Sequence, residues 1–164
     1  MGAGKILVII GALLTLVSTF FLAFYEAASG DFGSGLGFIY NIADIMANPG
    51  DYVSGQTMTV YIVAIVYIVF LISGVLQLLG LANRVFAIIG SAIVLFASIM
   101  MLLVLLNILP AYADYITLFE QPAIVPGILP YNLPIGIGSL GTYTVLAGGV
   151  LGFVGGILGT KDSF

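Results

Sequence analysis

Three side chains with distinctive chemistry are missing from this sequence, which contains no cysteine, no histidine and no tryptophan. Without cysteine, disulfide bonds, thiolate metal sites and cysteine nucleophiles are excluded. Without histidine, the chain lacks the commonest metal ligand and general base in proteins. We therefore expect no enzymatic activity, no cofactor and no metal site, and no residue is a candidate for a catalytic role.

Charge is also scarce. Only 6% of the 164 residues are charged, whereas 62% are hydrophobic. A soluble domain carries about 25% charged residues, so this chain cannot build a water-exposed surface over its whole length. Its three basic residues cannot form the positive surface that nucleic acid requires. The composition predicts one integral membrane domain, residues 1–164, whose first partner is the lipid bilayer.

Four uncharged, apolar segments are long enough to cross a membrane as helices, at about residues 6–25, 59–82, 85–108 and 137–159. A helix rises about 1.5 Å per residue and the hydrocarbon layer is about 30 Å thick, so some 20 residues are needed. None of the segments alternates with the period of a membrane barrel strand. The first is longer than the core of a signal peptide, about 7–15 residues, so we expect it to be retained. The predicted class is an all-α, four-helix transmembrane bundle.

The basic residues predict the orientation of the bundle. Lys5 precedes the first span, Arg84 lies between the second and third, and Lys161 follows the fourth, so all three fall on one side. The positive-inside rule makes this side cytoplasmic. Both termini would then be cytoplasmic in a multi-pass protein of the cell membrane, with outer loops at about residues 26–58 and 109–136. Six of the seven acidic residues fall on the outer side: Glu26, Asp31, Asp44, Asp51, Asp114 and Glu120.

This arrangement of four helices, with both ends inside and a longer first outer loop, resembles the layout of tetraspan proteins. Claudins share that layout, and their first outer loop carries a tryptophan-containing signature and a cysteine pair. The present chain has neither residue type. The resemblance therefore implies a tetraspan topology and no functional residue.

The first outer loop contains a helical pattern in the stretch GFIYNIADIMANPG, residues 37–50. Asn41 and Asp44 share one face, and Pro49 with Gly50 ends the pattern. Apolar residues recur on the other face at helical spacing: Phe38, Ile39, Ile42, Ile45 and Met46. We predict a short amphipathic helix that either caps the bundle or faces a partner protein.

The second outer loop contains PAIVPGILPYNLP, residues 122–134, in which every fourth residue is proline: Pro122, Pro126, Pro130 and Pro134. This spacing forbids a regular helix, and backbone that is not helical cannot face lipid. The residues between the prolines are almost all apolar, and Ile124, Ile128 and Leu129 are candidate docking residues. We predict an extended strap that either covers its own bundle or docks on a neighbouring subunit.

The fourth span, LAGGVLGFVGGILG, is rich in glycine. Gly148, Gly152 and Gly156 are spaced by four, and Gly155 and Gly159 repeat this spacing on an adjacent face. Small residues at this spacing let two helix backbones approach closely. A glycine zipper is therefore predicted, whose partner helix belongs either to the same chain or to another one.

Two amides interrupt the apolar spans, Gln77 well inside the second and Asn107 near the outer end of the third. We interpret both as interhelical hydrogen-bonding groups, because polar side chains between membrane helices usually bond to one another. No ionisable residue lies inside any span, which argues against a pump or a proton-coupled transporter.

Two functions fit these features. The first is a non-enzymatic structural or accessory subunit of a larger membrane assembly. Its partners would be other membrane subunits or copies of itself, held through the glycine faces and the apolar outer loop. The alternative is an oligomeric channel or pore whose acidic outer vestibule concentrates cations.

Overall fold

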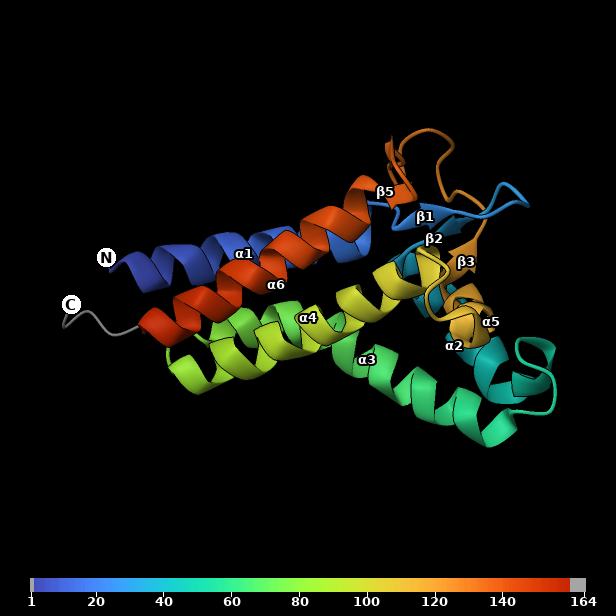
Figure 1. The fold of residues 1–164 in the computed structure, drawn as a ribbon, viewed down its shortest axis with the longest axis horizontal. Helices are drawn as coiled ribbons and strands as arrows, with labels where there is room; N and C mark the ends of the chain where they lie inside the picture. Colours follow the sequence, from blue (N-terminus) through green and yellow to red (C-terminus); the bar gives the residue numbers. More distant parts are fainter. Residues whose placement is uncertain (1, 160–164) are drawn as a thin grey trace.

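The computed structural model describes residues 2–159, and its main feature is four long helices. These are α1 (Ala3–Phe21), α3 (Thr57–Leu79), α4 (Arg84–Leu105) and α6 (Leu140–Leu158). Each is long and apolar enough to cross a membrane, which confirms the prediction of four apolar helices of spanning length. The start of α1, the α3–α4 turn and the end of α6 gather at one end of the molecule, and the remaining elements lie at the other (Figure 1).

The helix α6 packs against α1 and α4 through glycine. A Cβ atom on Gly11 of α1 would lie 2.5 Å from the backbone nitrogen of Gly152 and 2.7 Å from the carbonyl oxygen of Gly148. A Cβ atom on Gly155 would lie 2.7 Å from the carbonyl oxygen of Gly4. These spaces are smaller than any side chain needs, so the two helices touch backbone to backbone.

The other glycine face of α6 lies against α4. A Cβ atom on Gly156 would lie 2.8 Å from Cγ1 of Ile88, and one on Gly149 would lie 3.0 Å from Cγ of Leu95. Gly159 follows α6 with φ 94° and approaches Gly4 at the start of α1. The glycines therefore make contacts between helices of the same chain, but they divide differently from the prediction, because Gly148 contacts α1 whereas Gly156 contacts α4.

Two long segments, residues 22–56 between α1 and α3 and residues 106–139 between α4 and α6, form a second layer that we call the cap. It contains the helices α2 (Gly35–Ala47) and α5 (Ala113–Ile116). Three 3-10 helices complete its helical part: η1 (Pro49–Asp51), η2 (Pro110–Tyr112) and η3 (Thr117–Phe119). A small antiparallel sheet of order β1-β2-β3 joins the two segments: β1 (Tyr25–Glu26), β2 (Phe32–Gly33) and β3 (Glu120–Gln121).

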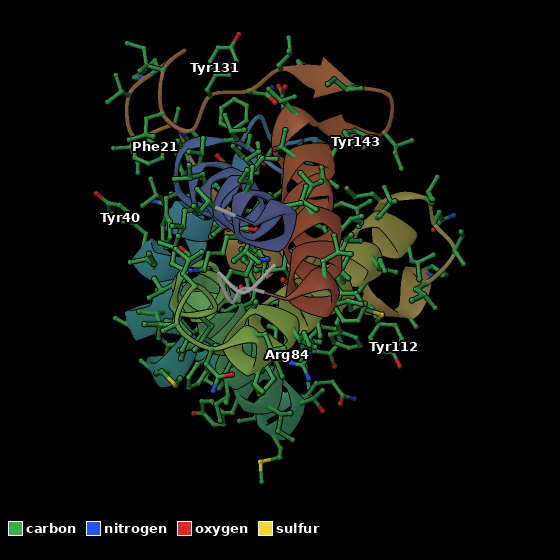
Figure 2. All side chains as sticks on the ribbon, turned by 90° about the vertical axis from the view of Figure 1, so that its left-hand side faces the viewer. Phe21, Tyr40, Arg84, Tyr112, Tyr131 and Tyr143 are labelled. Carbon is green, nitrogen blue, oxygen red and sulfur yellow. The ribbon has the colours of Figure 1, made fainter. Side chains whose placement is uncertain are left out.

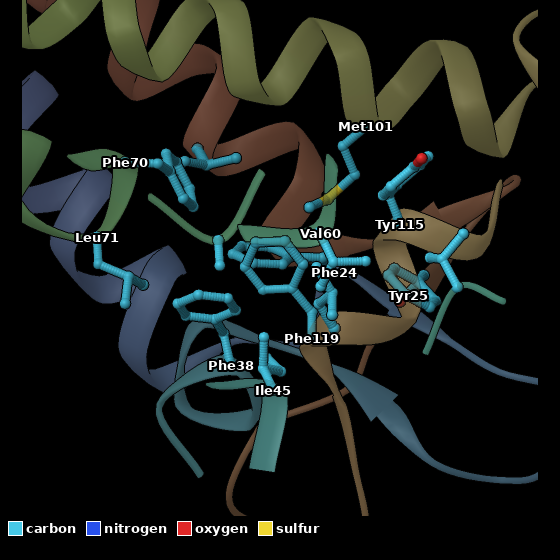
Figure 3. Packing of buried hydrophobic residues seen from close by; sticks show 14 of the residues in the cluster. Phe24, Tyr25, Phe38, Ile45, Val60, Phe70, Leu71, Met101, Tyr115 and Phe119 are labelled. Carbon is cyan, nitrogen blue, oxygen red and sulfur yellow. The ribbon is translucent and has the colours of Figure 1, made fainter. Parts of the chain in front are cut away.

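An aromatic cluster holds the cap on the bundle. The ring of Phe119 lies 4.4 Å from that of Tyr67 in α3, 5.4 Å from Phe38 in α2 and 5.8 Å from Phe24. It also lies 6.4 Å from Phe70 in α3. Edge and tilted ring contacts at these separations each stabilise by roughly 0.5–1.5 kcal/mol beyond burial. Phe119 is therefore the hub of the buried cluster shown in Figure 3.

Two spans are shorter than predicted at the cap end, because residues of the cap lie where we expected helix. α1 ends at Phe21 because Leu22 is extended, and the N–H groups of Ala23 and Phe24 donate to the carbonyls of Tyr131 and Gly33 instead of to the helix. α6 begins at Leu140 because the preceding residues form a hairpin. Its strands are β4 (Pro134–Ile135) and β5 (Gly138–Ser139).

The helix α2 confirms the expected short helix but corrects the predicted polar face. Asp44 is exposed, as expected, whereas Asn41 is half-buried. Nδ2 of Asn41 donates to the carbonyl oxygens of Leu118 (3.2 Å) and Glu120 (2.8 Å), so it joins α2 to the second cap segment. The edges of the predicted apolar face are exposed instead, at Ile39 and Met46.

We predict that Gly11→Ala lowers the melting temperature in detergent, measured by circular dichroism. The new methyl group would collide with backbone of α6, and overpacking costs about 1–3 kcal/mol. Gly50→Ala is the matched control, because nothing lies within 4 Å of a Cβ atom there. Without a collision, alanine would stabilise the interior of α1 by roughly 1 kcal/mol relative to glycine. A Gly11→Ala protein that is as stable as the Gly50→Ala protein would therefore contradict the backbone contact between α1 and α6.

Candidate functional site

Charge is separated between the two ends of the molecule. Lys5 lies in the first turn of α1 and Arg84 begins α4. Both of these helix ends lie opposite the cap (Figure 1), and Figure 2 shows Arg84 at this end. Lys161 lies outside the described residues. All six acids that the sequence places in the outer loops belong to the cap, which contains no lysine or arginine. The cap is therefore the acidic end of the molecule and the candidate functional site.

One cap acid is paired with a buried tyrosine. The hydroxyl of Tyr25 donates to the carbonyl oxygen of Ile116 (2.6 Å) and to Oε1 of Glu120 (3.2 Å). Burial, and then the neighbouring carboxylate, raise the pKa of Tyr25. Burial also raises the pKa of Glu120 above its ordinary value of 4.5, and the hydrogen bond from Tyr25 offsets this only in part.

A second acid has the opposite environment. Asp44 is fully exposed and accepts hydrogen bonds from Nδ2 of Asn48 and from the hydroxyl of Tyr52, both at 2.9 Å. These two bonds lower the pKa of Asp44 below its ordinary value of 3.8. Burial, followed by the bond to Asp44, raises the pKa of Tyr52 to about 12.

The cap acids are distributed rather than gathered at one point. Within residues 2–159, no three acidic side chains come close enough together to hold a metal ion. The pair of Tyr25 and Glu120 links β1 to β3, and Asp44 links α2 to the residues on either side of η1, Asn48 and Tyr52. The acids therefore give the cap a negative surface and hold its elements together.

The proline strap is attached to its own chain at one end. The N–H of Tyr131 donates to the carbonyl of Phe21 (2.8 Å), and the carbonyl of Tyr131 accepts from the N–H of Ala23 (2.9 Å). Asn132 donates through Nδ2 to Oε2 of Glu26 (2.7 Å) and accepts from the hydroxyl of Ser139. The strap thus lies on the end of α1, where Figure 2 shows Tyr131.

The other end of the strap projects from the cap. A tight turn, closed by the N–H of Val125 and the carbonyl of Leu129 (3.0 Å), carries side chains that nothing covers. Ile124, Val125 and Ile128 are 37%, 41% and 68% exposed, and we call these three residues the apolar tip. Of the prolines, Pro130 is buried, whereas three are exposed: Pro122, Pro126 and Pro134.

The two predicted intramembrane amides have different environments. Gln77 is fully buried, and its Nε2 donates to Oγ of Ser91 in α4 (3.0 Å) and to the carbonyl oxygen of Gly148 in α6 (3.4 Å). It therefore bridges three helices. Asn107 is instead exposed, with φ 57°, and it ends α4 rather than bonding between helices. Asparagine tolerates this left-handed conformation better than most residues.

Two features of the cap could not be predicted from the sequence, namely the pair of Tyr25 and Glu120 and the central position of Phe119. Tyr25 and Glu120 are 95 residues apart, and strands of two residues leave no period that could be detected. Phe119 ends η3, in the outer loop for which we predicted only the proline strap. Its central position becomes visible only in the fold, because the rings around it come from α2, from α3 and from the segment after α1.

Comparison of the chain with protein family models, with curated proteins and with solved structures finds no match. The class of the protein is therefore defined by its own geometry. It is a helical protein with four helices that could span a membrane and an acidic, partly apolar cap at one end.

The pKa of Glu120 is raised and that of Asp44 is lowered. The two residues should therefore change the free energy of unfolding with pH in opposite directions. Glu120 binds its proton more tightly in the folded protein, so its contribution to stability is lost as the pH rises from about 4.5 through its raised pKa. Asp44 binds its proton less tightly, so its contribution is lost as the pH falls from about 3.8 through its lowered pKa. Melting temperatures measured between pH 3 and pH 8 should show this difference.

Glu120→Gln should therefore raise the melting temperature at neutral pH and have little effect at the acidic limit. Asp44→Asn should lower it at neutral pH, and the difference from wild type should shrink as the pH falls. Each variant is the control for the other. The same pH profile in both variants would show that the two environments do not control stability.

Proposed function

We propose that this protein is a non-enzymatic structural or accessory subunit of a larger assembly in the cell membrane. Lys5 and Arg84 would face the cytoplasm, in agreement with the positive-inside rule, and the acidic cap would face outward. In this orientation the protein offers its partners a shaped outer surface and the lipid-facing sides of its helices.

One observation carries the proposal: the apolar tip projects from an otherwise ordered cap. Ile128 is 68% exposed although the strap is anchored to α1 through Tyr131. Exposed apolar side chains gathered in one patch are typical of contact sites for other proteins. Three further apolar side chains of the strap and the β4–β5 hairpin are also exposed: Leu133, Ile135 and Ile137.

The glycines of α6 support the proposal indirectly, because they pack within the chain and not against a partner as the sequence also allowed. Gly148, Gly152 and Gly155 contact α1, and Gly149 and Gly156 contact α4. They stabilise the bundle of one chain, so the proposed contact with a partner rests on the apolar surface of the cap. The glycines then keep that surface in a fixed position.

The alternative function, an oligomeric pore, has less support. Polar residues that could line a pore between copies, Ser73, Gln77 and Ser98, are buried inside the bundle of one chain. Within one chain, the backbone contacts between α1 and α6 leave no space for a water-filled path along that interface. The acidic cap is the remaining feature that would favour a cation channel.

The proposal predicts that Ile128→Glu releases the protein from its assembly. Native mass spectrometry of the protein, extracted from its own membranes in mild detergent, should show wild type bound to other chains in a fixed ratio. A buried apolar side chain of this size contributes about 1.5–3 kcal/mol, so the charged variant should appear mostly as a monomer.

Met58→Glu is the matched control, because Met58 is 73% exposed near the same end of the bundle but lies outside the strap and the hairpin. It should leave the assembly intact. Wild-type protein that is extracted as a bare monomer would contradict the proposed function. A wild-type ring of identical subunits that conducts ions after reconstitution would favour the pore instead.

A further inference from the structure

An apolar cavity lies between α3 and α4 next to the cap. These two helices pack closely at their turn and diverge toward the cap (Figure 1). The cavity has a volume of about 210 Å³, and Phe70, Ala97 and Met101 form part of its wall. Phe70 and Met101 are only 1% and 6% exposed, and both lie on the α4 side of the buried cluster in Figure 3. Tyr112, Tyr115 and Ile116 close the end nearest the cap.

A second, more open hollow of about 440 Å³ lies along the same pair of helices. Val66 and Phe96 line both spaces, so the two adjoin, and we call them together the α3–α4 track. On α4 the track runs from Ile89 to Val104, which at 1.5 Å per residue is about 22 Å. One leaflet contributes about 15 Å of hydrocarbon, so a lipid chain fits within the track.

The size of the cavity matches a small hydrocarbon group. An engineered apolar cavity of about 150 Å³ already binds a small hydrocarbon such as benzene. Because the cavity is apolar and opens to the side of the bundle, the occupant that fits it within a bilayer is a single hydrocarbon chain.

The negative charge of the cap favours a zwitterionic phospholipid over an anionic one. The track ends at Tyr112 and Tyr115, next to Asp114, in a cap that has six acids and no basic residue. An anionic head group at this end would meet only like charge, whereas a zwitterionic head group would bring its own positive charge to the acids. Tyrosine is enriched where membrane proteins meet the head-group region, so Tyr112 and Tyr115 mark the expected head-group end of the track.

We propose that the α3–α4 track is a lipid site that binds one acyl chain of a zwitterionic phospholipid, with its head group beside Tyr112 and Asp114. The chain enters from the bilayer and fills the cavity as far as Phe70 and Met101. This inference concerns the lipid-facing side of the bundle and does not depend on the subunit role proposed for the cap.

The absence of tryptophan allows a direct test by fluorescence quenching. A single Phe70→Trp substitution places a reporter in the cavity wall, and the protein is reconstituted in phosphatidylcholine vesicles with brominated acyl chains. Bromine quenches tryptophan at short range, so a chain in the cavity quenches this buried reporter. Phe21→Trp, at a side chain that is 58% exposed on α1, gives the signal for full contact with lipid.

Filling the cavity provides the decisive comparison. Ala97→Phe, added to the Phe70→Trp protein, should remove most of the quenching because the new ring occupies the space of the chain. Ala147→Phe is the matched control on α6, exposed and outside the track, and should leave the quenching unchanged. Circular dichroism and the Phe21→Trp signal, measured in the same backgrounds, show whether each protein is folded.

The outcomes separate clearly. Quenching of Phe70→Trp that Ala97→Phe removes and Ala147→Phe preserves supports the site. Quenching that persists with Ala97→Phe, in a folded protein, overturns it, as does a Phe70→Trp protein that bromine does not quench. Brominated phosphatidylglycerol should quench Phe70→Trp less than phosphatidylcholine does, and equal quenching by the two lipids would overturn the assignment to a zwitterionic lipid.

Discussion

The structure depends on one constraint, which is that helices in a bilayer gain no hydrophobic free energy by leaving lipid for one another. The bundle meets this constraint by close contact of backbones. Gly11 against Gly148 and Gly152, and Gly4 against Gly155 and Gly159, leave no room for a Cβ atom between α1 and α6. Because α6 also packs on α4 through glycine, it fixes the positions of the helix ends from which the cap is built.

The cap follows a different physical rule, because it is built like a small soluble domain on top of the bundle. Its buried centre consists of large rings around Phe119, and two of its partners, Tyr67 and Phe70, come from α3. Short strands and the Asn41 side chain satisfy backbone groups that could not face lipid. The cap is thus ordered enough to present both an acidic surface and an apolar tip.

Some predictions from sequence were wrong for identifiable reasons. Asn41 was assigned to the exposed face by periodicity, but carbonyls of the distant segment around Phe119 provide it with hydrogen-bond acceptors. Asn107 was read as an interhelical group because it follows an unbroken apolar run, whereas its backbone conformation ends the helix. Both errors concern polar side chains, whose role depends on partners far away in the chain.

The sequence alone determined the four helices that could span a membrane and the separation of basic from acidic residues, because these follow from hydropathy, length and charge within single segments. It also indicated that glycine would bring helices together and that the prolines would prevent a fifth long helix. Only the tertiary structure decided that the glycines pack within one chain and that Tyr25 meets Glu120. The same holds for the cavity between α3 and α4, because each of these features requires atoms from segments that meet only after folding.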